Sequence, residues 1–223
     1  MTRSLFSNGL RKLGACVAVA ALAGCVSTRD TLATRFEPAV NPAQGVAVRI
    51  DKVEDLRRFQ IKPASPATPS LMDDQIGNDA IRARAYGRKR NSYGMALGDV
   101  MLPEGQTVAG MTQAVVTRSL RESGYRVVDR NDADYAQAKP LTVRVNKLWV
   151  WQDLTAFAGG LVTDYDVAIT DPTGPAQQEV TVNGAIKARA LDSWNEGLWP
   201  HGIRIGLEEI NAKLKAALAA ARR

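Results

Sequence analysis

Apolar and polar residues alternate in several stretches of the chain, and this alternation predicts β-strands. The pattern is present at residues 46–51, 141–146, 161–169 and 180–189. A period of two turns successive side chains to opposite faces of a sheet, so each strand has one face for a core and one for solvent. A further short strand is predicted at residues 125–128, directly after a helical stretch.

The last three of the long strands are predicted to form an antiparallel meander. They are joined by short links rich in turn residues, such as the run DPTGP at 171–175. Links of this length are too short for the crossover that parallel neighbours require. The first of these strands continues to Trp151, and at 148–151 both of its faces become apolar. The apolar face of the meander therefore needs a cover.

Two stretches with apolar residues at helical spacing supply this cover. The first helix is predicted to follow Pro103-Glu104-Gly105 and to end at Gly124, since glycine readily adopts the left-handed conformation of a helix cap. The second helix is predicted from His201 to Ala221. We therefore expect a single α+β domain over residues 45–223. Its mostly antiparallel sheet has about four to six strands, with two amphipathic helices packed on one face.

The first 24 residues have the pattern of a secretory signal peptide. Basic residues, Arg3, Arg11 and Lys12, precede an apolar run at 13–22. This run is shorter than the roughly 20 apolar residues that span a bilayer. We therefore expect residues 1–24 to direct export and to be removed.

Small residues lead up to a cysteine at the predicted cleavage point, in the run Leu22-Ala23-Gly24-Cys25. This run resembles the lipobox of bacterial lipoproteins, which implies that Cys25 is lipidated and begins the mature protein. The alternative is an ordinary cleaved signal followed by an incidental cysteine. Residues 25–44 show no sustained period and are expected to form a lipidated flexible tether.

Charge and cysteine content narrow the classes of function. The chain carries a net charge of +6, but half of it belongs to residues 1–24, which weakens a nucleic-acid interpretation. Of the two cysteines, Cys16 leaves with the signal and Cys25 takes the lipid, and His201 is the single histidine. This inventory disfavours a zinc site and Ser/His or Cys/His catalysis. We expect no metal, no cofactor and no nucleic-acid partner.

One pair of carboxylates is a candidate catalytic site. Asp164 and Asp166 lie two residues apart on a predicted strand, so both project from one face, and burial could raise the pKa of one for acid–base work. Lys187 and Arg189 on the neighbouring strand are expected to pair with them instead. The sequence contains no phosphate-binding loop or nucleophile elbow. We therefore expect no catalytic residues and a protein that is not an enzyme.

Two features are candidates for binding a partner. The densest basic cluster is RARAYGRKRN at 82–91, and Arg88, Lys89 and Arg90 in it can bind carboxylates or phosphates, although a solvated turn is the plainer interpretation. Trp194 and Trp199 lie in a predicted loop before the last helix, where exposed rings stack on sugars or anchor an interface. Between the first predicted strand and the basic cluster, prolines at 63, 66 and 69 predict an irregular surface loop over residues 63–80.

Four further segments carry a resemblance beyond the lipobox. They are the GRKRNSYG turn, the LPEGQTV helix start, the RESGYRVV corner and the final amphipathic helix. On these segments the chain resembles the YajG-like family of bacterial outer-membrane lipoproteins. In lipoproteins of this kind aspartate after the cysteine favours inner-membrane retention. Val26 stands there instead, so the resemblance implies a lipid anchor on the periplasmic face of the cell outer membrane.

These observations lead to two hypotheses for function. The first is a non-enzymatic accessory domain of the envelope, anchored to the outer membrane through Cys25, that binds an envelope protein partner. The alternative is a module that binds peptidoglycan or lipid, in envelope maintenance or lipid transport, through the basic cluster and the two tryptophans. Both hypotheses place the protein in the periplasm.

Overall fold

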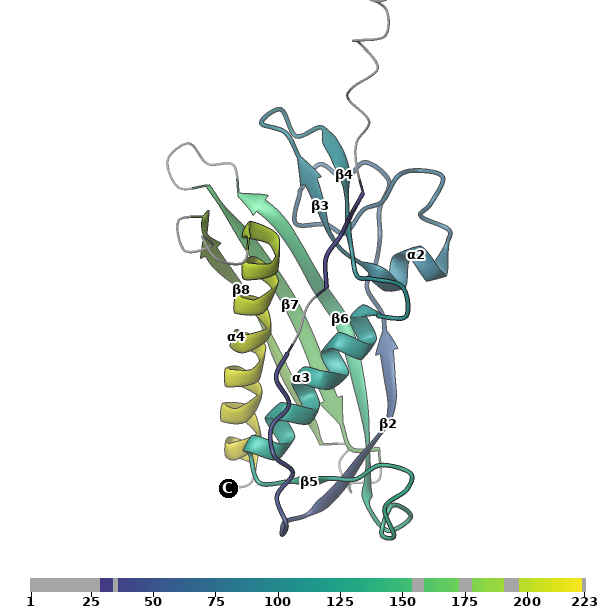
Figure 1. The fold of residues 1–223 in the computed structure, drawn as a ribbon, viewed down its shortest axis with the longest axis vertical. Helices are drawn as coiled ribbons and strands as arrows, with labels where there is room; N and C mark the ends of the chain where they lie inside the picture. The colour runs from purple at the N-terminus through teal and green to yellow at the C-terminus, as the bar shows by residue number, and fades with distance from the viewer. Residues whose placement is uncertain (1–28, 34–35, 154–158, 173–177, 191–196, 222–223) are drawn as a thin grey trace, which may run out of the picture.

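The computed structural model describes residues 29–33, 36–153, 159–172, 178–190 and 197–221. These residues form one eight-stranded sheet and three helices (Figure 1). In chain order the elements are β1 (Asp30–Thr31), β2 (Ala47–Asp55), α2 (Asp79–Arg84), β3 (Ala85–Arg90), β4 (Ala96–Met101), α3 (Val108–Glu122), β5 (Arg126–Val127), β6 (Lys139–Asp153), β7 (Gly160–Thr170), β8 (Glu179–Arg189) and α4 (Leu198–Ala221).

The sheet is built around β6, its longest strand. Along one edge β6 pairs antiparallel with β7, which pairs antiparallel with β8, so the predicted meander is present. Along the other edge the first half of β6 pairs in parallel with β2, and β3 contacts its second half at Val150. The short strand β5 lies beyond β2, while β4 and then β1 lie beyond β3.

The predicted fold class was wrong in its sheet. We expected a mostly antiparallel sheet of about four to six strands and two helices, whereas the sheet is mixed, with eight strands, and there is a third helix, α2. Four pairings, β1–β4, β2–β5, β2–β6 and β3–β6, are parallel. The two residues of β1 carry no readable period, whereas β5 lies within the short strand predicted at 125–128. Register shifts between β3 and β4 also interrupt the alternation that would reveal this hairpin.

The two long helices lie on one face of the sheet, with α3 crossing β6 and β2 and α4 running along β7 and β8 (Figure 1). The hydroxyl of Thr107 accepts a hydrogen bond from the Gly110 amide at 3.0 Å and begins α3. Gly124 follows the end of α3 at a φ of 79°. The main core lies between these helices and the sheet, and includes Val116, Leu120 and Ile203.

Part of the opposite face of the sheet, around the second half of β6, is covered by the proline-rich segment. Leu71 and Trp149 are fully buried together in a second apolar cluster. The indole Nε1 of Trp149 donates to the carbonyl of Pro66 at 3.1 Å, which fixes the loop over the strand. The prediction that both faces of β6 are apolar near Trp149 therefore has a physical basis: each face meets its own core.

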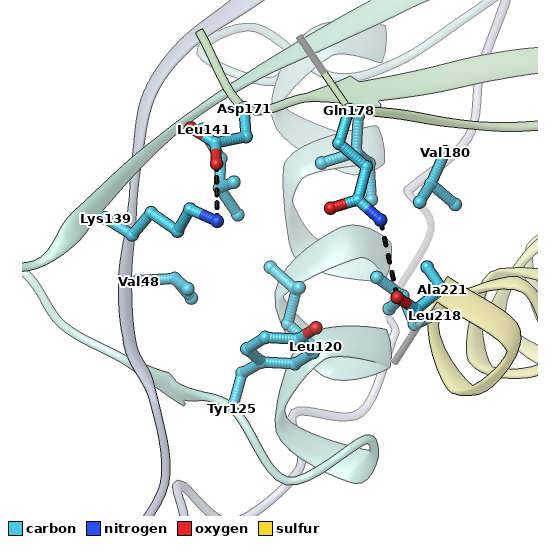
Figure 2. A pocket seen from close by; sticks show the side chains of 11 residues that line it. Val48, Leu120, Tyr125, Lys139, Leu141, Asp171, Gln178, Val180, Leu218 and Ala221 are labelled. Atoms are coloured by element: carbon cyan, nitrogen blue, oxygen red, sulfur yellow. Dashed lines mark hydrogen bonds and ion pairs between the residues drawn. The ribbon is translucent and has the colours of Figure 1, made fainter. Parts of the chain in front are cut away.

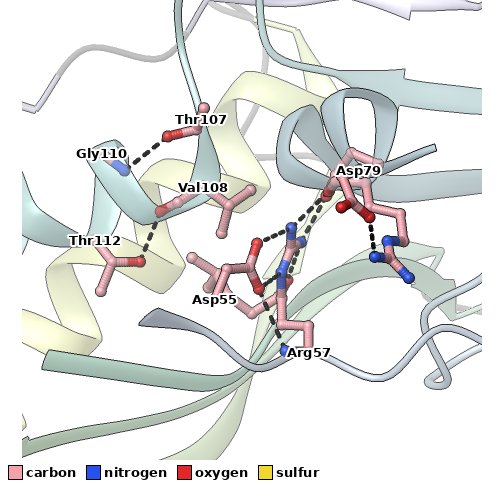
Figure 3. Close-up of polar contacts among 10 residues, drawn as sticks. Asp55, Arg57, Asp79, Thr107, Val108, Gly110 and Thr112 are labelled. Carbon is pink, nitrogen blue, oxygen red and sulfur yellow. Dashed lines mark hydrogen bonds and ion pairs between the residues drawn. The ribbon is translucent and has the colours of Figure 1, made fainter. Parts of the chain in front are cut away.

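A buried arginine holds this second layer in place. Arg57 donates to both carboxylate oxygens of Asp55 at 2.8 and 2.7 Å, and to the carbonyls of Ala85 at 2.6 Å and Arg82 at 2.8 Å (Figure 3). Its side chain is fully shielded from solvent. A planar guanidinium can donate several hydrogen bonds in different directions. Through these bonds Arg57 joins the end of β2 to α2 and β3. Arg57 is therefore a structural residue.

Much of the expected tether lies on the domain. Within residues 25–44, Asp30 and Thr31 pair in parallel with Val100 and Met101 of β4. Further along, the side chain of Asn41 exchanges two hydrogen bonds of 2.9 Å with the backbone of Val127. The chain thus crosses α3 from the β4 end to the β5 end (Figure 1). From Asp30 onward the described part of this segment is attached to the sheet at both ends of its course.

Candidate functional site

The predicted basic cluster lies on β3, and its side chains are engaged. Arg88 faces the buried carboxylate of Asp99, with Nε and Oδ1 3.5 Å apart, and Lys89 pairs with Asp30. Arg90 donates to the carbonyl of Gly94 at 2.8 Å. Only 11% of the Arg88 side chain is exposed. The three cations therefore stabilise the hairpin and the attachment of β1, and they do not form the open cationic surface that we weighed.

Of the two candidate tryptophans, Trp199 is a core residue. Its side chain lies in the first turn of α4 and is buried among the residues of the main core. A Cβ on Gly87 would come within 2.7 Å of ring atom Cζ3, so the glycine gives the ring its space. Trp199 is not available to a partner in this structure. Trp194 and the predicted lipidation site Cys25 lie outside the described residues.

Both aspartates have polar partners, but not the ones that we expected. Asp164 lies 3.0 Å from the ammonium of Lys147 and accepts from Trp151 Nε1 at 3.1 Å. Asp166 accepts from Asn146 at 3.1 Å. These partners all come from β6, whereas Lys187 of β8 pairs with Asp153. The carboxylates therefore hold the meander together.

A small apolar pocket opens at the C-terminal ends of α3 and α4, between these helices and the sheet (Figure 2). Its volume is about 70 Å³. The lining comes from β2, the end of α3, β6, β7, β8 and the end of α4, and consists of Val48, Leu120, Tyr125, Lys139, Leu141, Ile169, Asp171, Gln178, Val180, Leu218 and Ala221. The pocket is the place where the main core reaches the surface.

Two polar contacts border the apolar lining. The ammonium of Lys139 lies 2.5 Å from Asp171 Oδ2, and only 5% of the aspartate side chain is exposed. On the other side, Gln178 donates to the carbonyl of Ala221 at the end of α4 (Figure 2). An apolar hollow with a few polar groups at its border is the usual form of a binding site, because burial supplies affinity and the polar groups fix orientation.

Sequence reasoning missed this pocket for a definite reason. Leu120 and Leu141 lie on predicted apolar faces, of the first helix and of a strand, and they are buried. Nothing in their spacing shows that the covering helices stop short here. The one usable signal is Lys139 at the start of a strand, matched by Asp171 directly after the next strand, because antiparallel pairing brings these two ends together.

The described residues contain no group of three or more His, Cys, Asp or Glu side chains that could hold a metal ion. Within the same ranges, no helix is both long and apolar enough to cross a membrane.

Comparison with known proteins adds little. No family model matches the chain, and no curated protein matches it. Among solved structures, an uncharacterized protein aligns with 84% of this chain and 98% of its own, at 7% identity and a TM-score of 0.40. A hemagglutinin homolog from Helicobacter pylori aligns over 85% of this chain and 90% of its own, at 11% identity and a TM-score of 0.33. Likenesses this distant carry no argument about function.

Proposed function

We propose that the chain is a lipoprotein of the outer membrane, anchored through Cys25, whose domain binds an envelope protein partner without catalysing a reaction. The partner inserts an apolar side chain into the pocket between α3, α4 and the sheet. The observation that carries the proposal is the pocket itself, an apolar hollow at the end of the core with an ion pair at its border.

The anchor rests on the sequence. A basic start, a short apolar run and the Leu22-Ala23-Gly24-Cys25 lipobox support export and lipidation. The resemblance to YajG-like lipoproteins and the valine after the cysteine favour the outer membrane. A lipidated cysteine carrying several acyl chains would give stable attachment, since a single chain is marginal.

The size of the pocket favours a protein partner over a lipid. Ligand sites for small molecules generally enclose about 300–1,000 Å³. The pocket offers about 70 Å³, which suits one apolar side chain and not an acyl chain. Buried side-chain anchors of this kind contribute much of the affinity at protein interfaces. Glycan binding loses one of its two expected rings, because Trp199 is buried.

The experiment is photo-crosslinking in living cells from position 178, with the native lipid anchor kept. It compares the wild type with Ala221→Trp, in which the new ring fills the mouth of the pocket. Ala219→Trp, on the exposed surface of the same helix turn, is the matched control. We expect capture of one discrete envelope protein in the wild type and in the control, and its loss in Ala221→Trp.

Other outcomes distinguish the parts of the proposal. Adducts with glycan or lipid alone would favour the peptidoglycan- or lipid-binding alternative. Equal capture in both tryptophan variants would exclude the pocket as the contact. Mass spectrometry of the mature N-terminus tests the anchor separately, and an unmodified Cys25 would contradict it.

A further inference from the structure

The hairpin of β3 and β4 carries exposed apolar side chains at its tip. Tyr93, Met95 and Leu97 are 87%, 61% and 45% exposed. Neighbouring apolar side chains left in water on a small domain usually mark a surface that is covered in use. The hairpin lies at the opposite end of the molecule from the C-terminal ends of α3 and α4 (Figure 1), and residues at those ends line the pocket. Whatever covers the hairpin tip is therefore distinct from the partner side chain that enters the pocket.

The tip has a fixed shape. The side-chain oxygen of Asn91 accepts from the amides of Tyr93 and Met95 at 3.0 and 2.9 Å, and Gly94 follows at a φ of 80°. Arg90 donates to the carbonyl of Gly94 at 2.8 Å. These bonds close a tight turn and hold Tyr93 outward without help from the core. The exposed residues are thus presented by a built loop.

The sequence around the tip is basic, but most of its cations are paired. Arg88 and Lys89 meet Asp99 and Asp30 at the base of the hairpin. Arg90, closer to the tip, donates to the carbonyl of Gly94. An apolar tip with a tyrosine and one arginine behind it suits the boundary between acyl chains and polar headgroups.

The path of the chain places the predicted anchor on the same side. Asp30 is in parallel register with Val100 of β4, so β1 and β4 both run away from the hairpin tip, and the described chain enters β1 from the tip side. Cys25 stands five positions before Asp30, as Met95 stands five positions before Val100. Five extended residues reach at most about 17 Å. A lipid on Cys25 therefore keeps the hairpin within about one strand length of the membrane surface.

We propose that the tip of the β3–β4 hairpin, through Tyr93, Met95 and Leu97, inserts into the headgroup boundary of the membrane that holds the lipid on Cys25. The hairpin is then a second contact with the bilayer. It fixes the orientation of the domain, with the apolar pocket turned away from the membrane. This inference rests on the proposed lipid anchor.

The test uses the full, lipidated chain in vesicles of phosphatidylethanolamine and phosphatidylglycerol. Once the signal is removed and Cys25 is lipidated, Tyr93→Cys supplies a free thiol for a polarity-sensitive fluorophore. Val40→Cys, 90% exposed and next to Asn41, which bonds β5 at the other end of the molecule, is the matched control. We expect the emission of the label at 93 to shift to the blue and to be quenched by nitroxide-bearing lipid, while the label at 40 responds to aqueous iodide alone.

The outcomes separate this inference from its basis. Mass spectrometry of Cys25 comes first, because an unlipidated cysteine would remove the anchor and the inference together. With Cys25 lipidated, labels at 93 and 40 that respond alike to iodide would overturn the membrane contact alone. A label at 93 that is shielded in cells and aqueous in vesicles would also overturn it, and would assign the tip to a protein. An unchanged thermal midpoint confirms that each labelled variant is folded.

Discussion

The two ends of the molecule are both apolar, but they are built in opposite ways. At the hairpin end the apolar side chains project from a closed turn and are independent of the core. At the pocket end the apolar residues are the core itself, left open where α3 and α4 stop. A projection suits a soft, deformable partner such as a bilayer, whereas a hollow suits a rigid side chain. A substitution at the hairpin tip should therefore change binding without changing stability, whereas a substitution in the pocket should change both.

The largest expected effect of this difference is on stability. Leu120 lines the pocket and is 1% exposed, so Leu120→Ala should lower the free energy of unfolding by about 2–5 kcal/mol. Tyr93→Ala at the hairpin end should stay within about 0.5 kcal/mol of the wild type, because Tyr93 is largely in water. Urea unfolding of both variants measures the contrast. Equal losses would show that the hairpin belongs to the core.

A smaller effect is expected at the border of the pocket. Lys139→Met leaves the carboxylate of Asp171, 5% exposed, without its lysine, which should cost about 1–3 kcal/mol. Lys187→Met is the matched control, because Lys187 also pairs with an aspartate at a strand end, Asp153, which is more exposed at 21%. That loss should stay below about 1 kcal/mol. If Lys187→Met lowers the free energy of unfolding as much as Lys139→Met does, burial of the aspartate does not make the ion pair at the pocket more important for stability.

The sequence was a good guide to the elements that the core creates. The meander of β6, β7 and β8 and the helices α3 and α4 follow from periods of two and 3.6 over long stretches, because one face of each must be buried. Even the doubly apolar stretch at 148–151 was informative, since each face of β6 has its own cluster. Long-range pairing was not readable. Parallel partners such as β2 and β6 are joined by neither a tight turn nor a shared local pattern.

The sites were harder to predict for a related reason. The exposure of a side chain depends on what other segments cover, and the sequence does not show this for Trp199 or Arg88. Trp199 was assigned to a loop, but α4 begins at Leu198 and carries the ring into the core. The apolar residues after Asn91 drew no attention, although Asn91 and Gly94 were correctly associated with a turn. Their neighbours Tyr93, Met95 and Leu97 are among the most exposed apolar side chains described.

The smallest expected effect concerns pH, and its sign differs between the ends. Near the pocket, burial alone would raise the pKa of Glu122, but hydrogen bonds from Arg118, Asn211 and Lys215 outweigh it and lower the pKa to about 2. Near the hairpin, burial raises the pKa of Asp99 above its usual value, against the opposing effect of Arg88 and Arg29. A carboxyl whose pKa is lowered by folding stabilises the fold at pH values above its unfolded-state pKa, and this contribution is lost as the pH falls. A carboxyl whose pKa is raised by folding destabilises the fold at higher pH, and this cost is relieved as the pH falls.

Acid should therefore weaken the link between α3 and α4 while it relieves the buried charge beneath the hairpin. Glu122→Gln should lose about 1 kcal/mol at neutral pH, and its difference from the wild type should vanish as pH falls from 4.5 toward 2. For Asp99→Asn the wild type should instead gain relative to the variant as pH falls toward 3.8. Urea unfolding across this range measures both slopes. If both differences in unfolding free energy change with pH in the same direction, the two ends do not differ in electrostatics. The contrast between them would then rest on the projecting hairpin and the hollow pocket alone.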